Sequence, residues 1–228
     1  MIPYTREKQE TLKSKFNGVE TIDKNYSQAY QDMFVLTMLE GKRDGTYLEV
    51  GACHPVLISN TYLLDSKFGW KGISIDINPS VKAGYDGNRN CNLIVQDALT
   101  IDYAKLLADN NMPNQIDYLQ LDIEPQSNTL ACLKRMPLND YRFSVITYET
   151  DFYDPAFSRE DSLKNREESR EILLSHGYEL IVGNVCNTST TDPFEDWYVD
   201  PNVVSKELIE LFKQSSEFDN VSEKAMMV

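Results

Sequence analysis

Short runs rich in β-branched and aromatic residues alternate along this chain with helical patterns, and this alternation constrains the fold more than any other feature. Strands separated by helices of about ten residues need crossover connections, which make neighbouring strands parallel and place helices on both faces of the sheet. The sequence therefore predicts an α/β fold with a doubly wound, mostly parallel sheet of six strands and a candidate seventh. The strand-like runs are 46–50, 71–77, 92–97, 116–123, 143–149 and 178–185, with a candidate seventh at 196–200, and the helical patterns are 27–41, 59–69, 101–110, 128–136 and 159–177.

The same patterns predict the domain organisation. Residues 1–25 are polar and weakly patterned, so we expect a loose leader with one helical turn at most. Residues 26–213 are expected to form a single domain, because no repeat or linker interrupts them and 228 residues suffice for one full core. The polar tail, 214–228, is expected to be disordered.

Composition and charge restrict the partners. The formal net charge is −14, whereas nucleic acid and anionic membranes both require basic surface, so neither is expected to bind. The four cysteines lack CxxC spacing, which favours free thiols in a reducing compartment over disulfides or a zinc site. No apolar run approaches the ~20 residues of a membrane span, and residues 1–16 lack the apolar stretch of a signal peptide. We therefore expect a cytoplasmic protein.

The turn after the first strand-like run limits the kind of ligand. It reads EVGACHP (49–55) and contains a single glycine, Gly51. A pyrophosphate site at this position uses the pattern GxGxxG, because the backbone must close on the phosphates. The sequence therefore argues against a dinucleotide and allows a ligand without phosphates that approaches the backbone closely at Gly51.

Acidic residues end the next two strands. Asp76 follows Gly51 at roughly the spacing at which an acid binds the ribose hydroxyls of a nucleoside, and Asp97 is placed to accept a hydrogen bond from an amine such as that of adenine. Either acid could instead be a helix cap or a loop residue. Together with Glu49 they favour a nucleoside without phosphates. S-adenosylmethionine fits, because an acidic cleft favours its sulfonium cation.

Several blocks carry a more specific signal: YSQAYQDMFVL, GTYLEVGACHP, SNTYLLDSKFGWKGISIDINP, IDYLQLDIEP, VITYETDFY and PFEDWYV, all between Tyr26 and Pro201. In this order they resemble the FkbM-type family of S-adenosylmethionine-dependent methyltransferases. The resemblance implies the seven-stranded, Rossmann-like class I methyltransferase fold and O-methylation of a hydroxyl on a sugar or natural product. The segment Cys53-His54-Pro55 departs from the pattern, because methyltransferases more often carry a second glycine there.

The resemblance also implies roles for individual residues. Glu49 and Gly51 would lie along the methionine part of the donor, Asp76 would hold the ribose, and Asp97 the adenine. The helix that carries Gln31 would close over the donor, although contacts between this helix and a loop are an equal alternative. The complete set expected around the cofactor is Gln31, Glu49, Gly51, Asn60, Asp76, Ile77, Asp97, Ala98 and Asp122.

Two pairs of acids end the fourth and fifth strands: Asp122 with Glu124, and Glu149 with Asp151. Side chains two residues apart on a strand share a face, and these strands are neighbours in the expected topology, so the pairs would converge beside the donor. Carboxylates at close range repel one another unless a proton or a cation compensates, and such oxygen ligands suit Mg²⁺ or Mn²⁺. We expect at least two of the four to contact the acceptor or a metal. Helix capping and ion pairs with arginine are the alternative.

Methylation of a hydroxyl also needs a way to remove its proton. A divalent metal at Asp122, Glu124, Glu149 and Asp151 would lower the pKa of the hydroxyl. Without a metal, Asp122, Glu149 or His54 is the candidate general base, although orienting a loop is the favoured role for His54. The aromatic rings of PFEDWYVDP (193–201) could stack on a glycan, or be buried in the sheet.

These expectations define an O-methyltransferase that acts on a small-molecule or glycan acceptor. Two alternatives stay open. A nicotinamide-dependent oxidoreductase would need the GxGxxG pattern, which the sequence lacks. A non-catalytic nucleoside-binding module would bind the donor without turnover.

Overall fold

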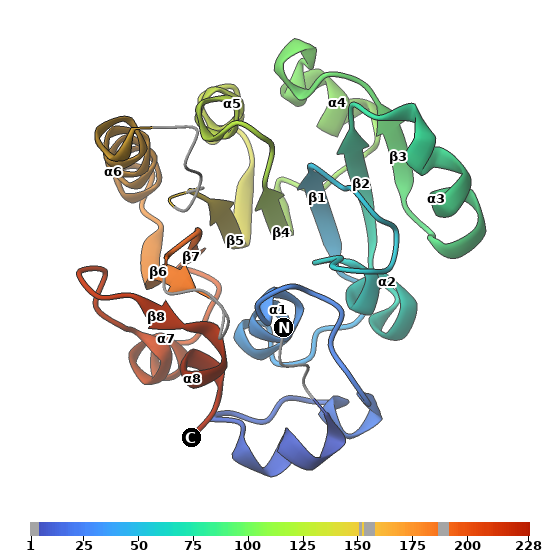
Figure 1. Ribbon diagram of the computed structural model, residues 1–228. Coiled ribbons are helices and arrows are strands. Elements are labelled where there is room, and N and C mark those ends of the chain that lie inside the picture. The colour runs from blue at the N-terminus through green and yellow to red at the C-terminus, as the bar shows by residue number, and fades with distance from the viewer. Residues whose placement is uncertain (1–4, 151, 153–157, 187–191) are drawn as a thin grey trace.

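The computed structural model describes residues 5–150, 152, 158–186 and 192–228. Its centre is a single sheet with the strand order β3-β2-β1-β4-β5-β7-β6-β8 (Figure 1). Every neighbouring pair is parallel except those of β7, which runs antiparallel to both β5 and β6. The mostly parallel sheet expected from the sequence is confirmed, with eight strands in the described residues rather than seven. The strands are β1 Thr46–Val50, β2 Lys71–Asp76, β3 Asn92–Val95, β4 Gln115–Leu121, β5 Arg142–Glu149, β6 Glu179–Cys186, β7 Glu195–Val199 and β8 Asn220–Val221.

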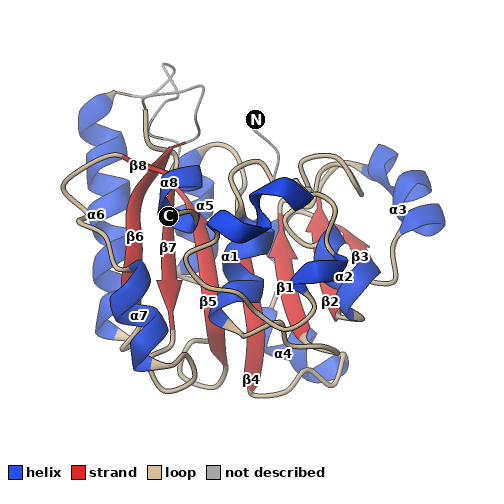
Figure 2. Ribbon diagram, turned by 90° about the horizontal axis from the view of Figure 1, so that it is seen from below, coloured by secondary structure: helices blue, strands red, loops and turns tan. Residues whose placement is uncertain are grey.

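Helices cover both faces of the sheet (Figures 1 and 2). Helices α1, α2, α7 and α8 pack on one face, and α4, α5 and α6 pack on the other. In the described residues no helix is long and apolar enough to span a membrane. The helices are α1 Gln31–Met38, α2 Tyr62–Phe68, α3 Lys82–Asn88, α4 Tyr103–Asp109, α5 Gln126–Leu133, α6 Arg159–Ser175, α7 Lys206–Phe212 and α8 Ser222–Met226.

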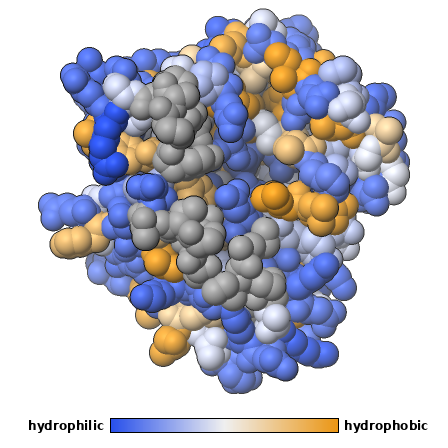
Figure 3. Space-filling view, in the orientation of Figure 1, coloured by the Kyte–Doolittle hydropathy of each residue, from blue (hydrophilic) through white to orange (hydrophobic). Residues whose placement is uncertain are grey.

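Each face has its own apolar layer. Phe34 of α1 stacks on Trp197 of β7 in the first layer, with 4.5 Å between ring centroids. The second layer places Leu107 of α4 and Leu133 of α5 against the inner strands. Figure 3 shows hydrophilic residues over much of the surface in that view, interspersed with patches of hydrophobic residues. Both faces of the sheet are covered, so consecutive strand residues are buried, and this explains why the strand-like runs are so apolar.

The tail expected to be disordered is instead folded, and that prediction is wrong. Residues 214–228 contain β8 and α8, and Ala225 and Met226 are fully buried. The Lys13 N–H donates to the Met226 carbonyl (3.0 Å), and the Val228 N–H donates to the Thr11 carbonyl (2.6 Å). The leader is likewise packed rather than loose, because its few apolar side chains join the first apolar layer. These are Leu12, Phe16, Val19 and Ile22.

Candidate functional site

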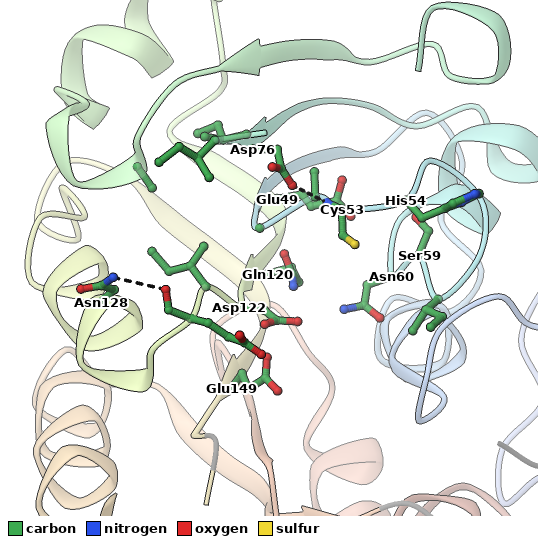
Figure 4. Close-up of a pocket in the computed structure, with 18 of the residues that line it drawn as sticks. Glu49, Cys53, His54, Ser59, Asn60, Asp76, Gln120, Asp122, Asn128 and Glu149 are labelled. Atoms are coloured by element: carbon green, nitrogen blue, oxygen red, sulfur yellow. Dashed lines mark hydrogen bonds between the residues drawn. The ribbon is translucent and has the colours of Figure 1, made fainter. Parts of the chain in front are cut away.

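A cavity of about 740 Å³ opens at the carboxyl ends of the parallel strands (Figure 4). Its volume lies within the range of small-molecule sites, roughly 300–1,000 Å³. All the site residues expected from the sequence line it, apart from Asp151, which lies outside the described residues. They are Gln31, Glu49, Gly51, His54, Asn60, Asp76, Ile77, Asp97, Ala98, Asp122, Glu124 and Glu149.

The register of the sheet explains why the acids meet. Glu49 of β1 is aligned with Gln120 of β4, and Gln120 with Thr147 of β5. Asp122 and Glu149 come two residues after Gln120 and Thr147, and the Asp122 N–H still donates to the Val50 carbonyl of β1 (3.0 Å), so the two acids point to the same face of the sheet. Strand β4 ends at Leu121, so this strand pattern does not extend to Glu124, although Glu124 also lines the cavity.

Gly51 marks the closest contact between two strand ends. Its backbone is left-handed (φ +88°), and a Cβ at this position would lie 1.6 Å from the carbonyl oxygen of Asp122. Only glycine avoids that collision while keeping this backbone conformation. The close backbone approach expected at Gly51 is therefore present, but the group that approaches is the end of β4.

Glu49 is buried under the cavity within a polar network. Its two carboxylate oxygens accept hydrogen bonds from Thr61 Oγ1 (2.7 Å) and Ser74 Oγ (2.6 Å). Burial raises the pKa of Glu49, and the positive charge of Arg89 opposes that rise. Arg89 also donates to Thr61 Oγ1 (2.6 Å) and forms an ion pair with Asp65. No local pattern in the sequence indicates a role for Arg89, because the segment before it has neither a clear helical nor a clear strand pattern.

Asp76 and Asp97 face the cavity and also stabilise local backbone. Asp76 accepts hydrogen bonds from the N–H groups of Cys53 and Asn78, both at 2.7 Å. Asp97 accepts one from the Leu99 N–H (2.9 Å) and caps the 3₁₀ helix Ala98–Thr100. Because each carboxylate oxygen has two lone pairs, capping leaves room for a ligand hydroxyl or amine.

Two buried acceptors in the cavity have no partner among the described atoms: Asn60 Oδ1 and Gln120 Oε1. Asn60 is 7% exposed and Gln120 is 2% exposed. Figure 4 shows the two amides directed into the cavity from opposite sides. A buried acceptor without a donor costs about 1–3 kcal/mol, so the cavity suits a ligand that supplies N–H or O–H groups.

Asp122 and Glu149 lie close together at the ends of β4 and β5 (Figure 4). Among the described residues, however, no group of three or more His, Cys, Asp or Glu is arranged to hold a metal ion. The metal site expected at Asp122, Glu124, Glu149 and Asp151 thus finds no support in the part of the chain that is described, and we assign no metal to the cavity.

His54 has the geometry of a loop-orienting residue. Its Nδ1 accepts hydrogen bonds from the N–H groups of Val56 (3.1 Å) and Leu57 (2.9 Å). Figure 4 shows its ring turned away from Asp122 and Glu149. Since Nδ1 is already occupied as an acceptor, this arrangement favours the loop-orienting role over that of a general base.

Glu195 is a cavity residue that the sequence analysis did not single out. It is 2% exposed and pairs across the antiparallel strands with Glu149. Its Oε2 accepts hydrogen bonds from Gln31 Nε2 (3.0 Å) and Trp197 Nε1 (2.7 Å). Burial raises its pKa to about 7. Gln31 therefore lines the cavity and also positions a carboxyl group.

The aromatic residues of the same segment are buried. Phe194, Trp197 and Tyr198 are at most 4% exposed. Of the two readings that the sequence left open, the structure therefore favours burial in the sheet over stacking on a glycan. Trp197 is covered by helix α1, whose Phe34 stacks on its ring.

No family model matches the chain, and no curated protein matches its sequence. Among solved structures, it is similar to the N-methyltransferase NodS from Bradyrhizobium japonicum in complex with S-adenosylhomocysteine, with 11% identity over 75% of this chain and 86% of that one (TM-score 0.45). A candidate methyltransferase from Streptococcus mutans in the same complex has 12% identity over 74% and 94% (TM-score 0.48). The fibrillarin pre-rRNA processing protein of Methanococcus jannaschii has 17% identity over 69% and 67% (TM-score 0.48).

At such low identity these similarities concern the fold alone, and the strand order describes that fold directly. The order β3-β2-β1-β4-β5-β7-β6 with β7 antiparallel is that of the Rossmann-like class I methyltransferase fold, to which this chain adds β8. In open α/β sheets of this kind, ligands bind outside the carboxyl ends of the strands, where the cavity lies.

Proposed function

We propose that this chain is an S-adenosylmethionine-dependent methyltransferase. In line with its resemblance to the FkbM-type family, we propose that it methylates a hydroxyl group of a sugar or a natural product. One observation carries the proposal: three successive strands direct Glu49, Asp76 and Asp97 toward a single cavity, which also contains the unpartnered oxygens of Asn60 and Gln120.

The residues of the cavity suit each part of the donor. Asp76 would accept hydrogen bonds from the ribose hydroxyls, and Asp97 one from the adenine amine. Ile77 is 68% exposed at the edge of the cavity, where a flat base would cover its side chain. The amino group of the methionine part would supply the donors that Asn60 Oδ1 and Gln120 Oε1 lack.

S-adenosylmethionine would supply a methyl group bonded to a positively charged sulfur. When an acceptor oxygen attacks the methyl carbon, the carbon–sulfur bond breaks and the sulfur leaves as a neutral thioether. The chain must hold the acceptor oxygen ~3–3.5 Å from the methyl carbon and in line with the bond that breaks. In our proposal Asp122 and Glu149 orient the hydroxyl, and one of the two carboxylates accepts its proton as the new C–O bond forms.

A thermal-shift assay tests donor binding and separates the three functions considered. S-adenosylhomocysteine and S-adenosylmethionine should each raise the melting temperature, whereas NAD should not. Ligand at 100 times its dissociation constant adds about 2.7 kcal/mol of stability. Asp76→Ala should abolish the shift, and Asp86→Ala, which removes an exposed carboxylate paired with Lys82 on α3, should preserve it.

Stabilisation by NAD, or by none of the three compounds, would contradict the proposal. A non-catalytic module would show the shift but would not convert S-adenosylmethionine into S-adenosylhomocysteine when supplied with a metabolite extract. Conversion in the extract and none with Asp76→Ala is the result that we expect.

A further inference from the structure

The cavity carries many negative charges and, among the described residues that line it, no Lys or Arg. The residues outside the described ranges contain no Lys or Arg either. Six carboxyl groups besides Glu49 line the cavity, namely Asp76, Asp97, Asp122, Glu124, Glu149 and Glu195.

Arg89 compensates only the donor side of this charge. Its guanidinium lies below the cavity, where it interacts electrostatically with Glu49 and pairs with Asp65. The proposed donor brings one sulfonium, one ammonium and one carboxylate, which together amount to a single positive charge. Four further carboxyl groups lie at the carboxyl ends of β4 and β5 and at the start of β7, where the acceptor would bind: Asp122, Glu124, Glu149 and Glu195.

The unpartnered buried atoms of the cavity are likewise acceptors, and in the proposed function the ammonium group of the donor engages them. Asn60 Oδ1 and Gln120 Oε1 are both hydrogen-bond acceptors, and both residues are more than nine-tenths buried. No buried side-chain donor among the described residues of the cavity lacks a partner. These two buried oxygens therefore suit ligands with N–H or O–H groups rather than a phosphate or a carboxylate.

We propose that the acceptor carries a protonated amine close to the hydroxyl that is methylated, as an amino sugar or an amino alcohol does. This inference rests on the proposed function. Asp122 and Glu149 attract the ammonium group, and the same charges repel phosphorylated or carboxylated compounds of similar shape. The carboxyl groups of Asp122, Glu124 and Glu149 thereby determine which acceptors enter.

The charge selectivity can be measured without knowing the acceptor, because Cys53 is an exposed thiol in the cavity wall. Figure 4 shows its sulfur directed into the cavity. Two methanethiosulfonate reagents serve as probes, one with a trimethylammonium group and one with a sulfonate group. The rate at which each modifies Cys53 is read by mass spectrometry of the Cys53 peptide and divided by its rate with 2-mercaptoethanol.

We expect the normalised rate of the cationic reagent to exceed that of the anionic reagent at least about tenfold at low ionic strength, because an acidic cleft concentrates cations. The ratio should fall toward one in 1 M NaCl, where the screening length is about 3 Å. Glu149→Gln should lower it, whereas Asp86→Asn, which removes the same charge outside the cavity, should leave it unchanged. A ratio of one or less in the wild-type protein at low salt overturns the inference, whether or not the variants fold.

A second measurement tests the acceptor itself. A metabolite extract is separated into cationic, neutral and anionic fractions by ion exchange, and each is incubated with the protein and S-adenosylmethionine labelled in its methyl group. Label in the cationic fraction supports the inference, and label mainly in the neutral or anionic fraction overturns it. If no fraction is labelled, the proposed function is contradicted, and the Cys53 rates alone decide the charge preference of the cavity.

Discussion

At the scale of single residues, Gly51 determines how closely the ends of β1 and β4 approach. Gly51→Ala would place a methyl group 1.6 Å from the Asp122 carbonyl oxygen and force a left-handed backbone on alanine. We expect a loss of at least about 2 kcal/mol in the free energy of unfolding, measured with urea. Gly87→Ala is the matched control, because Gly87 lies in α3 with no atom within 4 Å of the added carbon. It should raise stability by about 0.5–1 kcal/mol, and equal losses in both variants would contradict the prediction.

Glu195 gives a prediction about pH. Burial raises its pKa to about 7 from an ordinary value of 4.5. Between these values the folded protein holds a proton that the unfolded chain has lost, so the free energy of unfolding falls as the pH rises through this window. Glu195→Gln removes that dependence. The stability of the variant relative to the wild type should therefore improve between pH 5 and pH 8, by an amount on the order of 1–3 kcal/mol.

Urea unfolding of both proteins at several pH values measures this difference. Burial also raises the pKa of Asp32 and Glu49, and their contributions have the same sign. Both groups are present in the variant, so they cancel in the comparison. Stability curves that stay parallel from pH 5 to pH 8 would show that Glu195 does not titrate in this range.

The sequence predicts a site residue well when residues close to it along the chain determine its position. Asp76 is the last residue of β2 and Asp122 directly follows β4, so the strand pattern alone places them at the cavity. Glu195 is different, because its partner Gln31 lies 164 residues away. Arg89 likewise lies 24 residues from Asp65. Contacts between such distant residues exist only after the sheet has formed, and no local pattern predicts them.

At the scale of elements, the strands were easier to predict than the helices. The run 46–50 matches β1 in full. Both faces of this strand are buried, and a buried strand favours the apolar residues that make the pattern recognisable. Helix α3 was missed, since it contains Gly84 and Gly87 and its single buried residue is Tyr85. The Tyr85 hydroxyl donates to the Ala52 carbonyl (2.9 Å), so tertiary contact rather than helix propensity holds this element in place.

Arg89, just after α3, joins three elements around the cavity. Its guanidinium donates to Tyr47 Oη of β1 (3.0 Å), to Thr61 before α2 and to the Pro55 carbonyl (3.1 Å). Arg89→Met would leave Asp65 buried without its cation. Removal of one partner of a buried ion pair costs about 3–5 kcal/mol, so we expect a loss of this size in urea unfolding.

The matched control is Arg43→Met, because Arg43 is exposed. Its guanidinium lies over the ring of Phe68 and donates to the Lys67 carbonyl. The control should lose less than about 1 kcal/mol. A loss for Arg89→Met no larger than that of the control would mean that Arg89 does not hold these elements together.

At the scale of the whole molecule, the ends of the chain were predicted least well. The tail looked disordered because its composition is polar, yet its few apolar residues are enough to hold it against the leader. Met226 is fully buried, and the backbones of Leu12 and Met227 form an antiparallel bridge. Average composition over a short segment hides such a contact, because the energy of docking comes from a few buried side chains and their backbone hydrogen bonds.

The net charge of −14 gives a prediction for the whole fold. Like charges destabilise a compact state through self-repulsion, and salt screens that repulsion over about 30 Å at 0.01 M but about 10 Å at 0.1 M. The melting temperature should therefore rise with NaCl, and most of the rise should occur below about 0.2 M, because screening is then nearly complete over the distances between surface charges. Calorimetry across a salt series measures this curve. A steady linear rise up to 1 M, without the steep initial part, would instead indicate exclusion of salt from the protein surface, and repulsion among the carboxylates would then contribute little to the stability of the fold.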